Sequence, residues 1–541
     1  MFTIITTMRK HFSHINVVIV LLAGMLSLCL TSCKKDEDAP VLPRQFKPGN
    51  ITVTTGQTEA KLEWAASLFT TGQNVTYTVQ ISKDSSFPQA AIVATRKVSS
   101  PTVVFTDTTL QVRQSYYARV RADSLGTTAQ SGWVLSPSFS ISGEQIFIAL
   151  TASDIIDNGV LLKWNVTPGL TNIVITRTST GATTTVALTP ADIAAGRKII
   201  TGLSASTAYS AEIFDATRSR GYLTFTTAAP LSGSLIDLRS ITGRTSVLAD
   251  TLPTIADGST VILRRGETYT IATNLNLSKS VKIISGADLS NPVQAIISLP
   301  ANFNVTAGST IAFLDFQDVA LIATDYTAKY VFNVSNACNI TRMGFESCRI
   351  ENMRGVCRLQ TAVINVTNFV VNNCIIDSIS NYGVLNIDNV NCTVANVAIT
   401  RSTIYKTEKV VTSKQNSTSV TISDCTFNET PYGNSTSSFI VDYGTLNVAN
   451  GVNISNCIFG KGKPNGTNIL VRDVRAGTAT SINSLNNYIT SDHTVTANPL
   501  TPVNSYSGAS TNLWVDPLNG NFRFADNSYP GRNSTGDPRW R

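Results

Sequence analysis

The sequence predicts an all-β protein in which two β-sandwiches precede a right-handed parallel β-helix. Charged residues make up only 14% of its 541 residues, and Thr, Ser, Asn and Val are abundant, a composition that favours strands. No long segment has the apolar spacing of an amphipathic helix. Two successive segments share one apolar skeleton, and the remainder repeats a short phrase every 23 to 32 residues, which is typical of a solenoid.

We interpret residues 1–32 as a lipoprotein signal peptide. Arg9 and Lys10 precede an apolar run over 15–30, which has the length of a signal-peptide core and is short for a membrane span. The run ends in Leu-Thr-Ser-Cys, so we predict cleavage before Cys33 and attachment of lipid to its thiol. An ordinary secretory signal with an incidental cysteine is the alternative.

Residues 33–48 form a predicted acidic, proline-rich tether, which begins Cys-Lys-Lys-Asp-Glu-Asp and contains three prolines that keep it extended. This segment resembles the surface-export signal of Bacteroidetes lipoproteins, in which a lysine and acidic residues follow the lipidated cysteine. The resemblance implies a protein that its lipid holds on the outer membrane, facing outward at the cell surface.

Residues 49–142 and 146–228 carry the same apolar skeleton. Each segment has a Leu-x-Trp triplet, whose alternation places Leu and Trp on one buried face, and a Leu followed six residues later by Tyr. The matching residues are Leu62 and Trp64, Leu110 and Tyr116, Leu162 and Trp164, and Leu203 and Tyr209. This pattern resembles the fibronectin type III domain, which implies a Trp in the core, a tyrosine corner and a spacer role for both domains.

From 230 to 500 the chain repeats a six-residue phrase: apolar, any, polar, small or Cys, any, apolar. Because the intervals vary while the phrase persists, we place insertions in turns and the phrase in the stacked strands of a parallel β-helix. Equivalent residues then stack about every 4.8 Å along the axis. The fourth position of the phrase holds Val319, Cys348, Cys374, Ser402, Cys425, Cys457 and Tyr488.

This column makes Cys348, Cys374, Cys425 and Cys457 a predicted packing ladder. Seven cysteines lie between Cys338 and Cys457, an odd number that cannot pair completely, and no Cys-x-x-Cys occurs, so we expect neither a disulfide framework nor a metal site. The third position suits a tight turn, because it is mostly small and polar. Its residues are Asp318, Ser347, Asn373, Arg401, Asp424, Asn456 and Asn486.

The two ends of the solenoid carry their own signals. Gly266-Glu267-Thr268-Tyr269 resembles the opening coil of pectate-lyase-type β-helices. The segment 501–541, with Asp-Pro-Leu-Asn-Gly-Asn-Phe and Gly-Asp-Pro-Arg-Trp, resembles the closing segment of Bacteroidetes lipoproteins that have a pectate-lyase-like β-helix of undefined function. Those proteins are often encoded beside polysaccharide-uptake genes, which implies a polysaccharide and components of a glycan-uptake transporter as partners. We expect the segment to cap the end of the helix.

The residues that catalysis on this fold would need are incomplete. The sequence argues against a polygalacturonase, since no Asp-Asp pair or Gly-His-Gly occurs, and His493 is expected in a frayed end of the helix. A polysaccharide lyase that acts on uronate glycan by β-elimination needs an Arg or Lys base and Ca²⁺ held by carboxylates. Candidate bases are Arg349, Arg354, Arg358, Arg401, Lys406, Lys409 and Lys414, and nearby carboxylates are Glu346, Glu351, Asp377 and Asp388. No cofactor is implied unless the protein is such a lyase.

Two similar motifs, Asn-Tyr-Gly-Val-Leu-Asn at 381–386 and Asp-Tyr-Gly-Thr-Leu-Asn at 442–447, favour glycan binding without catalysis. Their 61-residue spacing is about two coils, so the tyrosines are predicted to form an aromatic strip flanked by basic groups, which suits a uronate glycan. The candidate binding residues are Tyr382, Tyr405, Tyr443, Arg349, Arg401 and Lys406. Tyr-Gly as a simple turn marker is the alternative for the motifs, and an adhesin or structural protein is a further alternative for the chain. The net charge of +7 makes no case for nucleic acid.

Overall fold

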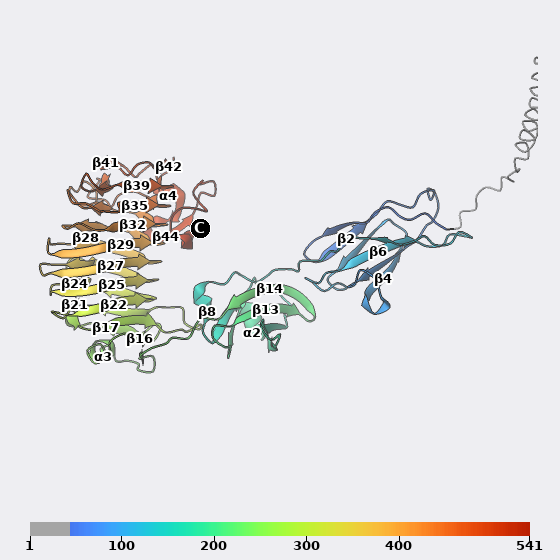
Figure 1. Cartoon of the computed structure of the whole chain (residues 1–541), viewed down its shortest axis with the longest axis horizontal. Coiled ribbons are helices and arrows are strands. Elements are labelled where there is room, and N and C mark those ends of the chain that lie inside the picture. Colours follow the sequence, from blue (N-terminus) through green and yellow to red (C-terminus); the bar gives the residue numbers. More distant parts are fainter. Residues whose placement is uncertain (1–43) are drawn as a thin grey trace, which may run out of the picture. The chain divides into compact units, whose positions relative to one another are not determined.

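The computed structural model describes residues 44–541 (Figure 1). The predicted signal peptide, Cys33 and residues 34–43 of the tether lie outside the described residues. Within the described part, none of the helices has the length and apolar character needed to cross a membrane. The helices are short: α2 (Pro190–Ala195), α3 (Val247–Thr251) and α4 (Ser510–Leu513).

The first sandwich consists of two antiparallel sheets, ordered β1-β2-β5 and β4-β3-β6-β7. Trp64 follows strand β2 and packs edge-on against Tyr77, with ring centroids 5.5 Å apart, in the buried layer. The Tyr116 hydroxyl accepts a hydrogen bond from the Gln111 amide at 2.9 Å, which makes the tyrosine corner. The strands are β1 (Thr52–Thr55), β2 (Glu59–Glu63), β3 (Tyr77–Ser82), β4 (Ile92–Val98), β5 (Thr102–Thr106), β6 (Tyr117–Ala122) and β7 (Val134–Leu135).

The second sandwich repeats this plan with sheets β11-β10-β13-β14 and β12-β9-β8. Trp164 is buried, and the Tyr209 hydroxyl accepts from the Ser204 amide at 3.0 Å, so both tyrosine corners are present. The predicted fibronectin type III-like sandwiches are confirmed. The strands are β8 (Ile155–Ile156), β9 (Gly159–Lys163), β10 (Asn172–Arg177), β11 (Thr183–Ala187), β12 (Arg197–Thr201), β13 (Ala208–Asp215) and β14 (Arg218–Thr226).

The predicted parallel β-helix is also confirmed, and its stacked coils have three faces (Figure 1). The first face is a ten-stranded parallel sheet. Its strands are β15 (Leu235–Asp237), β16 (Ser259–Leu263), β19 (Val281–Ser285), β22 (Thr310–Gln317), β25 (Cys338–Glu346), β27 (Ile364–Asn372), β29 (Cys392–Thr400), β32 (Ser419–Ser423), β35 (Val452–Ser455) and β39 (Ile482–Leu485).

The second and third faces share the long strands β26 (Arg349–Leu359) and β28 (Ile375–Ile387), which belong to both. The other strands of the second face are β17 (Thr268–Thr270), β20 (Ala295–Leu299), β23 (Val319–Ala323), β30 (Thr403–Tyr405), β33 (Thr426–Asn428), β36 (Ile458–Phe459), β40 (Tyr488–Ile489) and β42 (Asn504–Ser505). Those of the third face are β18 (Leu275–Leu277), β21 (Phe303–Val305), β24 (Tyr330–Val334), β31 (Val411–Ser413), β34 (Val441–Asp442) and β38 (Val474–Arg475).

The four ladder cysteines lie in one buried column between the first and second faces. The Cys348 amide donates to the Cys374 sulfur at 3.3 Å, and the Cys374 amide donates to the Ser402 hydroxyl at 3.0 Å. All seven cysteines of the β-helix are free and buried. The other three, Cys338, Cys357 and Cys392, are not part of the six-residue phrase, and they interact with one another elsewhere in the core.

The last coil departs from the predicted alignment by one residue. The Cys457 amide donates to the Asn487 side chain at 2.9 Å, and Ile458 pairs with Tyr488, so Asn487 and not Tyr488 holds the fourth position. The predicted alignment begins this coil at the apolar residue Leu485. Leu485 is exposed, however, and Ser484 is the residue in register with the buried Ile454.

The third position of the phrase is a left-handed turn in every coil. All seven residues have positive φ, between 49° and 57°, as the small polar side chains suggested. Arg401 is the exception in chemistry, because its φ of 49° is a conformation that Asn and Asp tolerate far better than Arg.

The segment 514–541 folds back, but along the second face and not over the end of the helix. Strands β43 (Trp514–Asp516) and β44 (Asn521–Phe524) pack with Tyr405 and Ile458, and Figure 1 shows β44 beside the coils. Trp540 Nε1 donates to the Thr403 hydroxyl at 2.7 Å. The segment therefore caps a lateral surface, because that surface carries apolar and aromatic side chains that water would otherwise meet.

Candidate functional site

The three predicted tyrosines do not form an exposed strip. Tyr443 is 1% exposed, and its hydroxyl donates to the Ser417 hydroxyl at 2.8 Å. Tyr405 is 8% exposed and lies beneath the folded-back segment, with its ring centroid 5.4 Å from that of Phe522. Neither ring is available to a sugar, so of the three only Tyr382 remains as a surface group.

The two Tyr-Gly motifs are similar in sequence but do not occupy equivalent positions in their coils. Strand pairing aligns Ile387 with Ser413, and Thr412 with Asp442, so Tyr443 is equivalent to Ile387. Ile387 is an inward-facing core residue, which explains why Tyr443 is buried while Tyr382 is not. Gly383 and Gly444 both have positive φ, as in the turn interpretation of the motifs.

Tyr382 reaches the surface through an irregularity in strand pairing. Met353 pairs with Ile379 and Gly355 pairs with Gly383, so two extra residues of β28 bulge between these pairs. Gly355 makes room for the bulge, because a Cβ atom there would lie 2.7 Å from the Cβ of Tyr382. The bulge therefore turns the ring outward at the corner between the second and third faces.

Two arginines from β26 lie against the Tyr382 ring. The guanidinium carbons of Arg354 and Arg358 are 4.6 and 4.3 Å from its centroid, and Tyr330 packs edge-on at 5.7 Å. Such cation–π contacts hold a guanidinium in place while its N–H groups face outward. We call the group of Arg354, Arg358 and Tyr382 the arginine shelf.

The arginine shelf carries more positive than negative charge. Arg358 and Lys414 both contact Asp388, at 2.6 and 2.8 Å, while Arg354 donates only to the amide oxygen of Asn381 at 3.2 Å. Burial would raise the pKa of Asp388, but hydrogen bonds from Lys414 and Arg358 outweigh it and lower the pKa overall. Two of the three cations thus share one carboxylate, and Arg354 has none.

The remaining predicted binding residues lie away from the shelf. Arg349 pairs with Glu351 at 2.9 Å, and Arg401 donates to the side-chain oxygen of Asn372 at 3.0 Å. Lys406 lies 5.5 Å from the centroid of the Tyr405 ring and occupies a second left-handed turn column. The structure therefore brings Tyr382 together with Arg354 and Arg358, and not with the three basic residues predicted to flank it.

A half-buried network that the sequence did not reveal joins Tyr326, Glu408 and Lys463. Lys463 Nζ contacts the Tyr326 hydroxyl, donates to the Lys406 carbonyl at 2.9 Å and lies 3.6 Å from Glu408. Burial lowers the pKa of Lys463. A lysine with a lowered pKa is a candidate base, but all three of its protons here face acceptors, so the network ties coils together.

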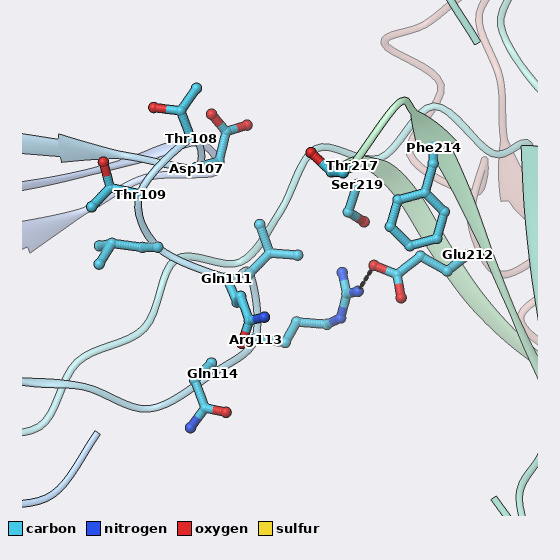
Figure 2. Close-up of a pocket in the computed structure, with 12 residues that line it drawn as sticks. Asp107, Thr108, Thr109, Gln111, Arg113, Gln114, Glu212, Phe214, Thr217 and Ser219 are labelled. Carbon is cyan, nitrogen blue, oxygen red and sulfur yellow. Dashed lines mark hydrogen bonds and ion pairs between the residues drawn. The ribbon is translucent and has the colours of Figure 1, made fainter. Parts of the chain in front are cut away.

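Other polar surfaces are better explained as structure. Arg113 points at Glu212 in a cavity of about 490 Å³ (Figure 2). Arg218 contacts Asp107, which also lines this cavity, at 2.5 Å. These ion pairs satisfy its charges. Among the described residues, no group of three or more His, Cys, Asp or Glu side chains is arranged to hold a metal ion.

His493 does not lie in a frayed end. Its side chain is fully buried, Nδ1 lies 2.8 Å from the Gly460 carbonyl, and Nε2 lies 3.0 Å from Asp473. The sequence pattern decays here, where side-chain hydrogen bonds join apolar contacts in holding the final coils together.

Three family models match the chain. A domain of unknown function (DUF4957) matches residues 267–407, a second domain of unknown function (DUF5123) matches 420–540, and the tissue factor family matches 18–131. No curated protein matches the sequence.

Three solved structures of chicken proteins are similar to part of the chain. The chicken CNTN1 FN1-FN3 domains are 14% identical, with 35% of this chain and 68% of that chain covered and a TM-score of 0.15. A two-domain fibronectin type III segment of chicken tenascin is 10% identical, with 34% and 99% covered and a TM-score of 0.17. The chicken interferon gamma receptor alpha chain is 12% identical, with 34% and 98% covered and a TM-score of 0.16.

Proposed function

We propose that the chain is a lipid-anchored protein of the bacterial outer membrane that captures uronate-containing polysaccharide on its β-helix without cutting it. The observation that carries the binding role is the arginine shelf, where an outward-turned tyrosine orients two guanidinium groups and Arg354 has no carboxylate partner. A guanidinium presents paired N–H donors that match both oxygens of a carboxylate. A polymer of uronate sugars would present such carboxylates repeatedly along the stacked coils.

Capture without cleavage is favoured by the state of three basic groups. Arg358 and Lys414 are committed to Asp388, and Lys463 is committed to three acceptors. A β-elimination base must reach the proton beside the uronate carboxylate with a free basic atom. The proposal also includes the lipid anchor and the outward-facing location, which rest on the resemblance carried by residues 33–38. It includes association with a glycan-uptake transporter, which rests on the resemblance carried by residues 501–541.

The binding role is tested by affinity electrophoresis of the full-length chain in gels that contain homogalacturonan. Arg354→Ala should lower the affinity about fivefold, because a partly exposed charge-assisted contact contributes about 1 kcal/mol. Tyr382→Ala should act similarly, since the guanidinium groups lose their support, whereas Tyr382→Phe should bind like the parent because it keeps the ring face.

Arg244→Ala is the matched control, because it removes the same charge from an exposed arginine that pairs with Asp250 elsewhere. Equal losses in Arg244→Ala and Arg354→Ala would reduce the effect to bulk charge. Release of products with unsaturated-uronate absorbance after addition of Ca²⁺ would replace capture by lyase activity. Absence of retention by every uronate glycan tried would leave adhesion or a structural role.

A further inference from the structure

A second cationic surface lies in the folded-back segment, where four arginines and two aromatic rings line a hollow of about 310 Å³. The lining residues are Arg523, Phe524, Arg532, Arg539, Trp540 and Arg541. These arginines line one cavity but belong to three segments: β44, the loop after it and the chain's last turn. We call this cavity the arginine hollow.

Two of the four arginines are fixed to the β-helix. Arg539 donates to the side-chain oxygen of Asn373 at 2.8 Å and lies 3.2 Å from Asp537. Arg541 donates to Asp424 at 3.0 Å. These contacts set the guanidinium positions without using all of their donors, since each guanidinium has five N–H groups.

The other two arginines have no side-chain partner in the described structure. Arg523 is exposed and Arg532 is half-buried, and neither guanidinium makes a hydrogen bond or ion pair. The two nearby carboxylates, Asp537 and Asp424, pair with Arg539 and Arg541. Two of the four positive charges around the cavity therefore have no counter-ion, an arrangement that an anion would stabilise.

The aromatic walls restrict what kind of anion fits. Trp540 is held by its Nε1 hydrogen bond to Thr403, and its ring lies 5.9 Å from that of Phe522. Phe524 packs against Tyr529 at 5.3 Å. Fixed ring faces beside cations suit a ligand that combines an apolar ring face with a charged group, as a uronate sugar does.

The third positions of the six-residue phrase form a column of left-handed turns, which we call the turn column. This column places one more arginine near the hollow. Arg539 contacts Asn373 and Arg541 contacts Asp424, and Arg401 occupies the turn of the coil between those two. Arg401 holds its left-handed conformation at a position where six other coils have Asp, Ser or Asn. A residue held in a strained conformation between these two contacts is a candidate for a functional role.

We propose that the arginine hollow is a second binding subsite, which takes a carboxylate borne on a sugar ring. Arg523 and Arg532 supply the free guanidinium groups, Arg539 and Arg541 the fixed ones, and Trp540 the ring face. The choice of a uronate over other oxyanions rests on the proposed function, while the existence of an oxyanion site rests on the hollow alone. The same chemistry is offered by a free oxyanion such as sulfate, and the experiment separates the two.

The test is arginine modification of the full-length chain with phenylglyoxal, with each arginine followed by mass spectrometry. Saturating trigalacturonate should slow modification of Arg523 and Arg532 about tenfold, the factor expected at about 90% occupancy. Modification of Arg244 should be unchanged. Fully methyl-esterified trigalacturonate, which lacks the charge, should give no protection, and Arg532→Ala should abolish the protection of Arg523.

In this experiment, modification of Arg354 tests the arginine shelf, whereas modification of Arg523 and Arg532 tests the arginine hollow. Protection of Arg354 without protection of Arg523 and Arg532 would overturn the hollow and leave the proposed function standing, and the converse would overturn the shelf alone. Equal protection by sulfate and by trigalacturonate at the same concentration would overturn the assignment to a sugar-borne carboxylate. Protection that survives methyl esterification would overturn the oxyanion site altogether.

Discussion

At the scale of single residues, the turn column shows how one backbone conformation selects side chains. Six of its seven positions hold Asp, Ser or Asn, and all have positive φ. Asn and Asp tolerate this conformation because their short side chains hydrogen-bond locally, whereas a long side chain gains nothing from it. Arg401 therefore stands out as a residue whose stability cost is offset elsewhere.

We expect Arg401→Asn to be more stable than Arg401→Ala by about 1 kcal/mol, the usual scale of strain at such a position. Both changes remove the charge and the 3.0 Å hydrogen bond to Asn372, so they differ mainly in tolerance of the left-handed turn. Urea unfolding of the two variants measures the difference. Equal stability would mean that the turn is not strained.

Replacement by serine should cost different amounts of stability at two buried cysteines. Cys374→Ser should cost less than about 1 kcal/mol, because Ser402 already fills the next position of the column and bonds to the Thr400 carbonyl at 2.7 Å. Cys357→Ser should cost about 1–3 kcal/mol, since the Cys357 sulfur makes no hydrogen bond and is fully buried. Thermal unfolding of both variants would reveal the order, and a reversed order would contradict the ladder account.

At the scale of elements, the phrase predicted the stacked strands, the cysteine column and the turns, because each depends on a side chain repeated once per coil. The bulge that exposes Tyr382 was not predictable, since two extra residues in β28 leave no periodic signal. Tyr443 was misplaced because matching letters were taken for matching register. Register depends on pairing with the neighbouring coil, which places Tyr443 in the core.

The final coils should lose stability as the pH rises through neutrality. Burial would lower the pKa of His493, but the hydrogen bond and charge of Asp473 outweigh it, so the folded pKa is raised. A raised folded pKa gives stability that is complete below the unfolded value of about 6.5 and lost as the pH rises through the folded value. His493 is the only histidine outside the predicted signal peptide, so this step should be isolated.

Melting temperatures measured between about pH 5.5 and 9 test this expectation. His493→Gln is the control, because glutamine does not titrate, and its melting temperature should be lower but free of the step. A step of the same size in both proteins would assign it to other groups.

At the scale of the whole molecule, the proposed anchor precedes every described residue. Cys33→Ala should leave the precursor uncleaved or release the protein from the outer membrane, since the thiol that carries the lipid is lost. Cell fractionation and surface labelling of the variant and the parent measure this outcome. Identical fractionation and labelling of the two would rule out the lipoprotein interpretation.

The folded-back segment was foreseen as a cap, but its destination was not. Trp514 and Phe522 are conspicuous in the sequence, yet nothing local shows that their partners are Tyr405 and Ile458. Such partners are chosen by shape and apolar area on a surface that exists only after the coils have stacked. The arginine hollow escaped the sequence for the same reason, since its residues meet only when this segment has docked.

The route of this segment also fixes an order of assembly. Coils pair with neighbours close in sequence, as with Cys348 and Cys374, which are 26 residues apart, whereas Arg539 and Asn373 are separated by 166 residues. Short loops close sooner than long ones, so the coils can stack while their second face still lacks its cover. Docking of 514–541 then acts as a final latch, and the arginine hollow forms only on chains whose coils have already stacked.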